Sequence, residues 1–294
     1  MGKDLKSIAV LLTCYNRREK TLACLRSVYT SKELSNHSFA MEIYLTDDGS
    51  SDNTGKVVAQ EYPGVHIISG HGNLYWTGGM RTSWLNALAD GNYDGFLLLN
   101  DDTLLNDNCF NQLFETDDLS RRRYYASGIY IGSVIDPRTL KHTYGGSILR
   151  NKWTFEIEDI IPDGTIKECD FGNGNIMFVP RSVVDKIGIL SNKYIHGKSD
   201  FDYTLRARKQ GIPVLVCSDY CGYCARDHIS PDFSDLTFRE RLANLKSPKG
   251  VELHGYMHFM WSFFPLRAPF VFLSMWLKTL CPGCYKILNK SIRR

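Results

Sequence analysis

The chain of 294 residues contains no long uninterrupted apolar run, which limits its relation to membranes and to export. The first apolar run, at 8–14, is followed closely by Arg17 and Arg18, so we expect a first strand rather than a signal peptide. An aromatic stretch at 256–277 is interrupted by two prolines and an arginine. Because a spanning helix needs about twenty uninterrupted apolar residues, we predict no membrane-spanning helix.

Strong net charge, internal repeats and low-complexity segments are also absent from the sequence. A net charge of +3 does not indicate nucleic-acid binding, and none is predicted. From residue 246 to 294, however, Glu252 is the only acid among basic residues (Lys246, Lys249, Arg267, Lys278, Lys286, Lys290, Arg293 and Arg294). Aromatic residues followed by a basic end are typical of a segment lying on an anionic membrane. The alternative is a helical hairpin packed on the domain or on a second subunit, as in a homodimer.

The nine cysteines do not form an even set, and several lie in apolar strand-like runs. We therefore expect reduced cysteines and a cytoplasmic protein rather than a disulfide framework. The spacing of Cys217, Cys221 and Cys224 is that of radical-SAM iron–sulfur enzymes, which stays an unfavoured alternative because the motif comes late in the chain. The pair Cys281 and Cys284 gives only weak evidence for redox chemistry.

Short strands and helices alternate through the first hundred residues. The apolar patterns predict strands at 7–13, 41–46, 65–69 and 95–99, and helices at 18–30, 53–61 and 79–90. Such alternation is typical of an α/β domain with a mostly parallel sheet, in which ligands bind at the carboxyl ends of the strands. Three loops at those ends are polar (13–17, 47–52 and 100–103), so we expect a site there.

The strand at 95–99 ends abruptly in Asn100, Asp101 and Asp102. Adjacent carboxylates suit a divalent cation, since Mg²⁺ is commonly held by one or two carboxylates and the phosphates of a substrate. Capping of a following helix is the alternative, because Asp and Asn are common at helix starts.

Five motifs in order resemble the family-2 glycosyltransferases of GT-A fold, and more loosely their rhamnosyltransferase-like members. They are IAVLLTCYNR at 8–17, TDDGSSDNT at 46–54, GNLYWTGGMR at 72–81, LNDD at 99–102, and HGKSDFDY at 196–203 with the later His228. The resemblance implies a GT-A fold, Rossmann-like with helices on both faces of a mostly parallel central sheet. It also implies a metal-dependent, inverting transferase that moves a sugar from a dTDP-, UDP- or GDP-linked donor to a glycan, such as a lipid-linked glycan of a surface polysaccharide.

The resemblance assigns the donor side of the site as follows. Asp102, at the last position of the family's Asp-x-Asp motif, and His228 are the expected ligands of Mg²⁺ or Mn²⁺. Asn100 stands where the family has an aspartate, which leaves fewer protein charges on the metal, and Asp101 is expected near the ribose or a water. The remaining expected donor-binding residues are Thr13, Tyr15, Arg17, Asp48, Trp76 and Gly79.

On the acceptor side, Asp200 is the expected general base, because acceptor activation needs a carboxylate beside the nucleophilic hydroxyl. Helix N-capping is the alternative for this residue. Asp202 is expected to orient Arg206, and the glycine-rich stretch 170–175 resembles the family's loop under the acceptor. Arg81 is expected either to meet phosphate or to lie on a solvated helix face.

The sequence therefore predicts three parts. Residues 1–105 form the nucleotide-sugar half, residues 106–232 the acceptor half of the same GT-A domain, and residues 233–294 a helical aromatic and basic extension. The last part suggests a cytoplasmic protein peripheral to the inner face of the cell membrane. A non-catalytic carbohydrate-binding protein with the same fold is the alternative function.

Overall fold

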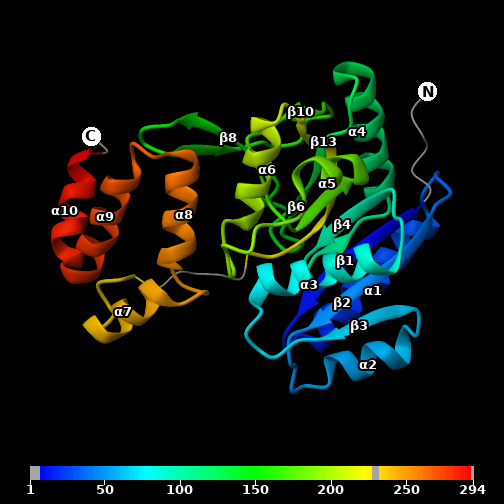
Figure 1. Cartoon of the computed structure of the whole chain (residues 1–294), viewed down its shortest axis with the longest axis horizontal. Coiled ribbons are helices and arrows are strands. Elements are labelled where there is room, and N and C mark those ends of the chain that lie inside the picture. Colours follow the sequence, from blue (N-terminus) through cyan, green and yellow to red (C-terminus); the bar gives the residue numbers. More distant parts are fainter. Residues whose placement is uncertain (1–6, 227–231, 293–294) are drawn as a thin grey trace.

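The computed structural model describes residues 7–226 and 232–292 as an α/β domain with a helical lobe at one side (Figure 1). His228, one of the two expected metal ligands, lies outside the described residues. The strands are β1 (Ser7–Cys14), β2 (Ala40–Asp47), β3 (Val65–Ser69), β4 (Gly95–Leu99), β5 (Leu104–Leu105), β6 (Ile129–Ile135), β7 (His142–Tyr144), β8 (Gly146–Asn151), β9 (Glu156–Asp159), β10 (Lys167–Glu168), β11 (Phe171–Gly172), β12 (Ile176–Pro180) and β13 (Val214–Tyr223). The helices are α1 (Arg18–Glu33), α2 (Thr54–Glu61), α3 (Tyr75–Asp90), α4 (Cys109–Tyr124), α5 (Arg181–Ile187), α6 (Ser199–Lys209), α7 (Phe238–Lys246), α8 (Leu253–Phe263), α9 (Ala268–Leu280) and α10 (Pro282–Ile292).

One large sheet runs through the domain in the order β10-β13-β6-β12-β4-β1-β2-β3. Strands β4, β1, β2 and β3 are parallel neighbours, and β13 is parallel to β6. Strand β12 lies between β4 and β6 and is antiparallel to both. The predicted mostly parallel α/β sheet is confirmed, and it joins the strands of the first hundred residues to those of the second half.

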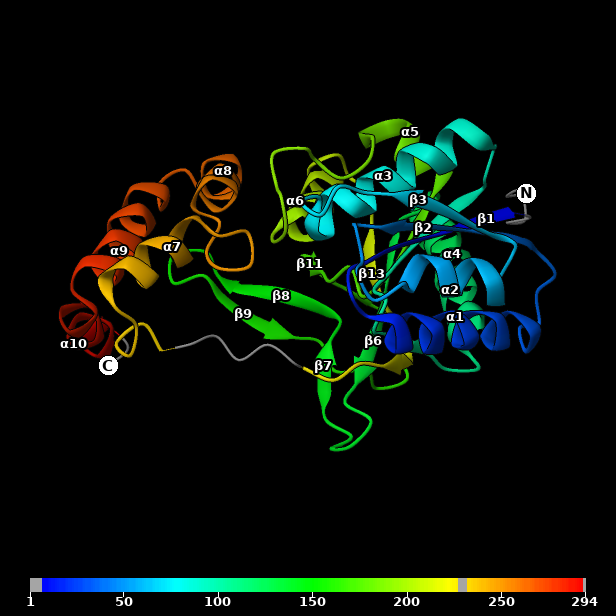
Figure 2. The ribbon, with the colours of Figure 1, turned by 90° about the horizontal axis from the view of Figure 1, so that it is seen from below.

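The central strands are apolar on both faces, and helices cover both faces of the sheet and bury them. Each face of the sheet has its own apolar core, and successive residues of β1 point into different ones. Val10 belongs to the core formed with α1, α2 and α4, and Leu11 belongs to the core formed with α3, α5 and α6. Figure 2 shows α3 and α5 above the sheet and α1 and α2 below it. The carboxyl ends of β1, β2 and β4 therefore open between these layers.

A second, three-stranded sheet (β11-β8-β9) connects the domain to the helical lobe. Phe171 of β11 shares an apolar core with Phe259, Met260 and Phe264 of the lobe, and Phe201 of α6 packs against this core. Figure 2 shows the β8–β9 hairpin reaching beneath the lobe. Part of the C-terminal extension is thus packed on the domain, in agreement with the alternative of a helical hairpin that packs on protein.

Helix α4 is not among the helices that the sequence predicts. Its buried face contains polar residues, listed as Asn111, Gln112, Thr116, Asp117 and Ser120. Apolar periodicity is therefore weak, although each polar group finds a partner in the fold. Helix α3 begins four residues earlier than predicted, at Tyr75 rather than Gly79.

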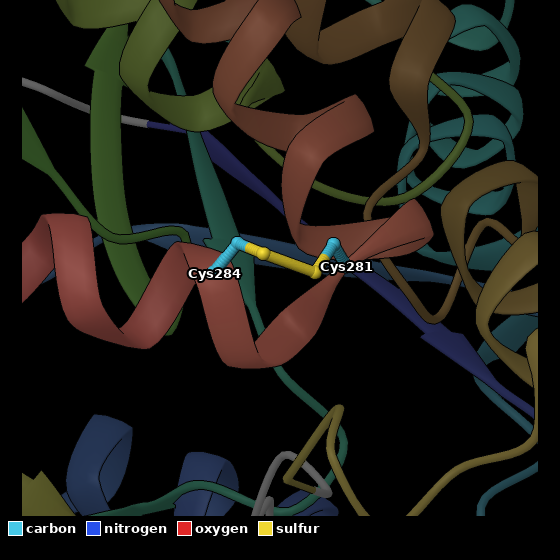
Figure 3. The surroundings of a disulfide bond; sticks show 2 residues. All are labelled: Cys281 and Cys284. Atoms are coloured by element: carbon cyan, nitrogen blue, oxygen red, sulfur yellow. A yellow bond between two sulfur atoms is a disulfide. The ribbon is translucent and has the colours of Figure 1, made fainter.

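The cysteines divide into two groups. Seven are free and buried (Cys14, Cys24, Cys109, Cys169, Cys217, Cys221 and Cys224), as expected for reduced thiols. Cys281 and Cys284 instead form a disulfide between the end of α9 and the first turn of α10 (Figure 3), so the expectation of reduced cysteines is wrong for this pair. Within the described part of the chain, the thiols of Cys217, Cys221 and Cys224 belong to no group of three or more residues suited to a metal ion, and the iron–sulfur alternative gains no support.

Among the described helices, none has the length and apolarity required to cross a bilayer.

Candidate active site

A cleft of about 310 Å³ lies at the carboxyl ends of the central strands. Its walls come from the β1–α1 loop, the start of α3, the loop after β4, the glycine-rich loop before β12, the start of α6 and the chain after β13. The lining residues are Arg17, Trp76, Asn100, Asp101, Asp102, Tyr144, Asn173, Gly174, Asn175, His196, Gly197, Lys198, Asp200, Phe201, Cys224 and Ala225. Motifs more than 180 residues apart in the sequence therefore meet in one place, as predicted for the loops around residues 17 and 100–102.

Arg17 holds the two aspartates that follow β4. Its Nη1 atom donates to Asp102 Oδ2 at 2.7 Å and to Asp101 Oδ1 at 3.1 Å. The bound guanidinium compensates two carboxylates that burial would otherwise make costly to ionise. Arg17 was expected to contact the donor directly, and its observed contacts place it as the partner of the Asp-Asp pair at the floor of the cleft.

Asp101 and Asp102 differ in their surroundings. Burial raises the pKa of Asp101 to about 7, with Asp102 adding to the rise and Arg17 opposing it. Asp101 Oδ2 is also within 3.4 Å of the Thr21 hydroxyl, so both of its oxygens face protein. Asp102 Oδ1 has the thiol of Cys224 at 3.8 Å and lies in the lining of the cleft. Of the two carboxylates, that of Asp102 is the better placed to meet a ligand.

The amide of Asn100 orients the indole of Trp76, whose Nε1 donates to Asn100 Oδ1 at 2.7 Å. The indole also lies against Gly174, where a Cβ atom would come within 2.4 Å of the ring. The bare backbone at 174 thus makes room for the ring. Asn100 therefore helps to fix Trp76 in the wall of the cleft.

The carboxylate of Asp200 lies in the first turn of α6 and lines the cleft. Its Oδ1 accepts from the N–H of Phe201 at 2.8 Å and its Oδ2 from the N–H of Gly174 at 3.2 Å. Burial raises the pKa of Asp200, while these N–H groups and the charge of Lys198 oppose the rise. Because burial raises the pKa of Asp200, its ionised carboxylate is a stronger base toward an acceptor hydroxyl than an exposed carboxylate would be.

The loop before α6 is held by α3. The N–H of Thr77 donates to Ile195 O at 3.2 Å, and the Thr77 hydroxyl lies 2.7 Å from Ser199 Oγ and 3.1 Å from His196 O. The first turn of α3 therefore connects the Asp-Asp side of the cleft to the Asp200 side.

Four predicted donor residues of the described chain lie outside the lining of this cleft: Thr13, Tyr15, Asp48 and Gly79. Asp48 is buried, and its two oxygens accept from the N–H groups of Gly72, Leu74 and Tyr75 at 2.8–3.0 Å. It thereby fixes the loop that leads into α3. Contact of Asp48 with a base or ribose stays a prediction. The contacts that the structure shows are those with the backbone of the loop before α3.

Gly79 of α3 lies directly against Thr13 of β1. A Cβ atom at Gly79 would lie 2.0 Å from Thr13 Oγ1, so the glycine permits close approach of α3 to β1. Both residues are buried, whereas Tyr15 is half exposed and has the Lys249 ammonium 5.9 Å from its ring centre. Direct nucleotide contact by these residues stays a prediction.

Contacts bear on two further expectations. Asp202 pairs with Arg206 at 2.8 Å, as predicted. Arg81 donates to the carbonyl of Leu190, and contact of this residue with phosphate stays a prediction. Lys198 and Tyr144 line the cleft without having been predicted there, although Lys198 stands inside the quoted HGKSDFDY motif, and Cys224 lines it although the sequence suggested it only as an iron–sulfur ligand.

The fold has a counterpart among solved structures. The crystal structure of GalNAc-T7 with UDP, GalNAc and Mn²⁺ matches this chain with a TM-score of 0.56 at 13% identity, over 76% of this chain and 44% of that one. At such identity the likeness concerns the fold, which is GT-A, as predicted.

Sequence comparison gives the family. The profile of glycosyl transferase family 2 matches residues 9–188, more than half of the chain, and the chain therefore belongs to this family. The low-salt glycan biosynthesis hexosyltransferase Agl10 of Haloferax volcanii is 22% identical over 224 residues, which are 72% of this chain and 65% of that protein. The chain thus spans slightly less than two thirds of this relative's length.

Proposed function

We propose that the protein is an inverting glycosyltransferase that moves a hexose from a nucleotide diphosphate donor to a glycan acceptor with the help of a divalent metal. The observation that carries the proposal is the meeting of Asp102 and Asp200 in one cleft of a family-2 domain. The first carboxylate suits the diphosphate end of a donor, and the second suits the hydroxyl of an acceptor.

The donor side fits a metal whose coordination is completed by the substrate. The Asp102 side chain lines the cleft and is 15% exposed, against 7% for Asp101, while its Oδ2 is bound to Arg17. Mg²⁺ or Mn²⁺ held by one carboxylate and a diphosphate is a common arrangement, and bound there it would neutralise charge on the leaving diphosphate. His228 remains a proposed second ligand.

On the acceptor side, Asp200 would take the proton of the attacking hydroxyl. A single base on one side of the sugar and a leaving diphosphate on the other give displacement with inversion at the anomeric carbon. Trp76, fixed by Asn100, offers an apolar ring face on which a sugar can stack.

The identity of the donor is tested by thermal unfolding with UDP, dTDP and GDP, each with and without Mn²⁺ or Mg²⁺. At one hundred times its Kd a ligand of the folded state stabilises it by about 2.7 kcal/mol, which for a chain of this size corresponds to about 5–10 °C. We expect one nucleotide to give such a shift only with metal. The absence of any nucleotide shift would contradict the donor site.

The same panel leads to the transfer assay. UDP-glucose, UDP-GalNAc, GDP-mannose and dTDP-rhamnose are offered with octyl α- and β-glycosides, which resemble a lipid-linked sugar. Transfer from dTDP-rhamnose would support the rhamnosyltransferase-like subgroup, and transfer from a UDP-sugar would exclude it. NMR of the product reports inversion or retention at the new bond.

We further propose that the helical lobe contacts an anionic membrane. On α9 the side chains of Phe270, Leu273 and Leu280 share one helical face and are 73%, 65% and 58% exposed. Leu266 and Ile287 are also exposed, and the segment from 246 onward is strongly basic. An outward apolar face with basic flanks favours a surface of anionic lipid over a neutral one. This would place the enzyme at the cytoplasmic face of a membrane that carries its acceptor.

Vesicle sedimentation tests this contact. We expect the chain to sediment with phosphatidylglycerol-containing vesicles, and Phe270→Ser/Leu273→Ser to lower the bound fraction at least tenfold, because each exposed apolar side chain contributes about 1.5–3 kcal/mol when buried. Thr82→Ser, on the domain, is the control. Equal binding of both variants would contradict the membrane contact, and dimerisation in ultracentrifugation that the double variant abolishes would assign the face to a second copy of the chain instead.

A further inference from the structure

We propose that Glu252, in the C-terminal extension, is a positioning residue for the acceptor side of the cleft. The inference rests on the proposed function and deepens it, because it assigns part of the acceptor site to a segment that the family match at 9–188 does not include.

The carboxylate of Glu252 binds three successive backbone N–H groups. It accepts from Ile195 at 2.7 Å, from His196 at 3.0 Å and from Gly197 at 3.2 Å. Glu252 is 7% exposed. Successive N–H groups that converge on one carboxylate form a concave anion site, and charge-assisted bonds of this kind are stronger than neutral ones.

The local backbone is adapted to this contact. Glu252 has φ of 51°, a left-handed conformation that is unfavourable for a residue with a side chain. At Gly255 a Cβ atom would lie 2.5 Å from Glu252 Oε1, so the glycine leaves room for the carboxylate. Lys198, at the far end of the loop, is also left-handed, with φ of 67°. Such strain persists where surrounding contacts determine the conformation.

The clamped residues belong to the wall of the cleft. His196, Gly197 and Lys198 line it, and α6 with Asp200 begins immediately after them. Thr77 of α3 holds the same loop from the other side. The loop is therefore fixed between the nucleotide half and the C-terminal extension, and Glu252 supplies one of its two supports.

Helix α8, which follows Glu252, is anchored to the domain by buried side chains. Phe259 and Met260 are fully buried in the core that includes Phe171, and Tyr256 has the Lys198 ammonium 5.7 Å from its ring centre. Figure 1 shows α8 facing α6 across this loop. Glu252 thus begins a helix that is itself anchored to the domain.

Loss of the carboxylate should affect the acceptor more than the donor, because the support on α3 and the Arg17–Asp102 pair remain. We choose Glu252→Gly, since glycine adopts the left-handed backbone without strain and protects folding. Gly255→Ala is a second variant that keeps the carboxylate but displaces it. Glu240→Ala is the control: Glu240 caps α7 in the same extension through Thr237 and lies away from the cleft.

The measurements are the Tm shift with UDP and Mn²⁺, transfer kinetics from the accepted donor to octyl glycosides, and hydrogen exchange of residues 195–198. For Glu252→Gly and Gly255→Ala we expect an unchanged nucleotide shift, faster exchange of these amides, and kcat/KM for the octyl glycoside lowered on the order of 10- to 100-fold, the usual cost of about 1 Å of misplacement. Glu252→Gln, which keeps one acceptor oxygen, should recover part of the loss.

Two outcomes are distinguishable. If wild type transfers sugar and Glu252→Gly has the same kcat/KM as Glu240→Ala, the positioning role is overturned while the proposed function stands. If wild type binds no nucleotide and transfers no sugar from any donor, the proposed function fails and this inference fails with it.

Discussion

Replacing Asp200 by Asn should lower kcat for sugar transfer by about 10²–10⁴-fold, the range in which a positioned general base contributes. The substitution keeps the shape of the side chain and one acceptor oxygen for the N–H groups of Phe201 and Gly174. Because burial raises the pKa of Asp200, the ionised form opposes folding above its ordinary value of 3.8. The neutral amide avoids that cost but can accept from only one of the two N–H groups, so the Tm at pH 7 should change little.

The pH profile gives a second reading of the same residue. Asp200 acts as a base only when ionised, so kcat should fall as the pH is lowered through its pKa, and this limb should lie above pH 3.8. Asp185→Asn, which removes an exposed partner of Arg181 on α5, is the matched control and should leave kcat unchanged. A fully active Asp200→Asn enzyme would favour the alternative in which Asp200 only caps α6, and inactivity of both it and wild type would favour a non-catalytic carbohydrate-binding protein.

Asp102→Asn is expected to abolish the metal-dependent part of nucleotide binding and to lower transfer on the order of 100-fold or more, since the metal would stabilise the departing diphosphate. Arg17 loses one of its two ionic partners, but the amide oxygen can still accept from Nη1. Calorimetry of the nucleotide with and without Mn²⁺ measures the effect: the metal-free affinity should stay as in wild type.

The neighbouring Asp101→Asn is the control for this prediction. Asp101 has both oxygens directed to Arg17 and Thr21, so its loss should change stability and leave the dependence on Mn²⁺ intact. If Asp101→Asn removes the Mn²⁺ effect and Asp102→Asn does not, the assignment of the two carboxylates is reversed.

The first half of the domain was predictable because its signals are local. Each strand from β1 to β4 is an apolar run that ends in polar residues, and the rule that ligands meet at the carboxyl ends of parallel strands brought Arg17 and Asp102 together before any coordinates. Asp200 followed only from the family resemblance, since a helix start with two acids is equally typical of capping.

The parts that escaped prediction depend on contacts between distant residues. Helix α4 buries polar side chains whose partners come from elsewhere, such as Asp117 with the hydroxyl of Tyr130 at 2.6 Å. The role of Glu252 depends on backbone N–H groups more than fifty residues away, which no side-chain pattern reveals. The sequence shows only that Glu252 is the single acid between residues 246 and 294, and its need for a partner follows from its burial in the fold.

The position of β12 has a consequence for synthesis on the ribosome. Strand β4 pairs with β1 on one side and with β12 on the other, and β6 also pairs with β12. During translation β1 to β4 can associate early, but one edge of β4 and one edge of β6 stay unpaired until residues 176–180 have left the exit tunnel. Unpaired apolar edges are templates for aggregation. The nascent chain therefore keeps unpaired apolar edges from the emergence of β4 until that of β12, and the second edge of β6 waits until β13 at 214–223 has emerged, so this is the interval in which we expect chaperone binding to protect the chain most.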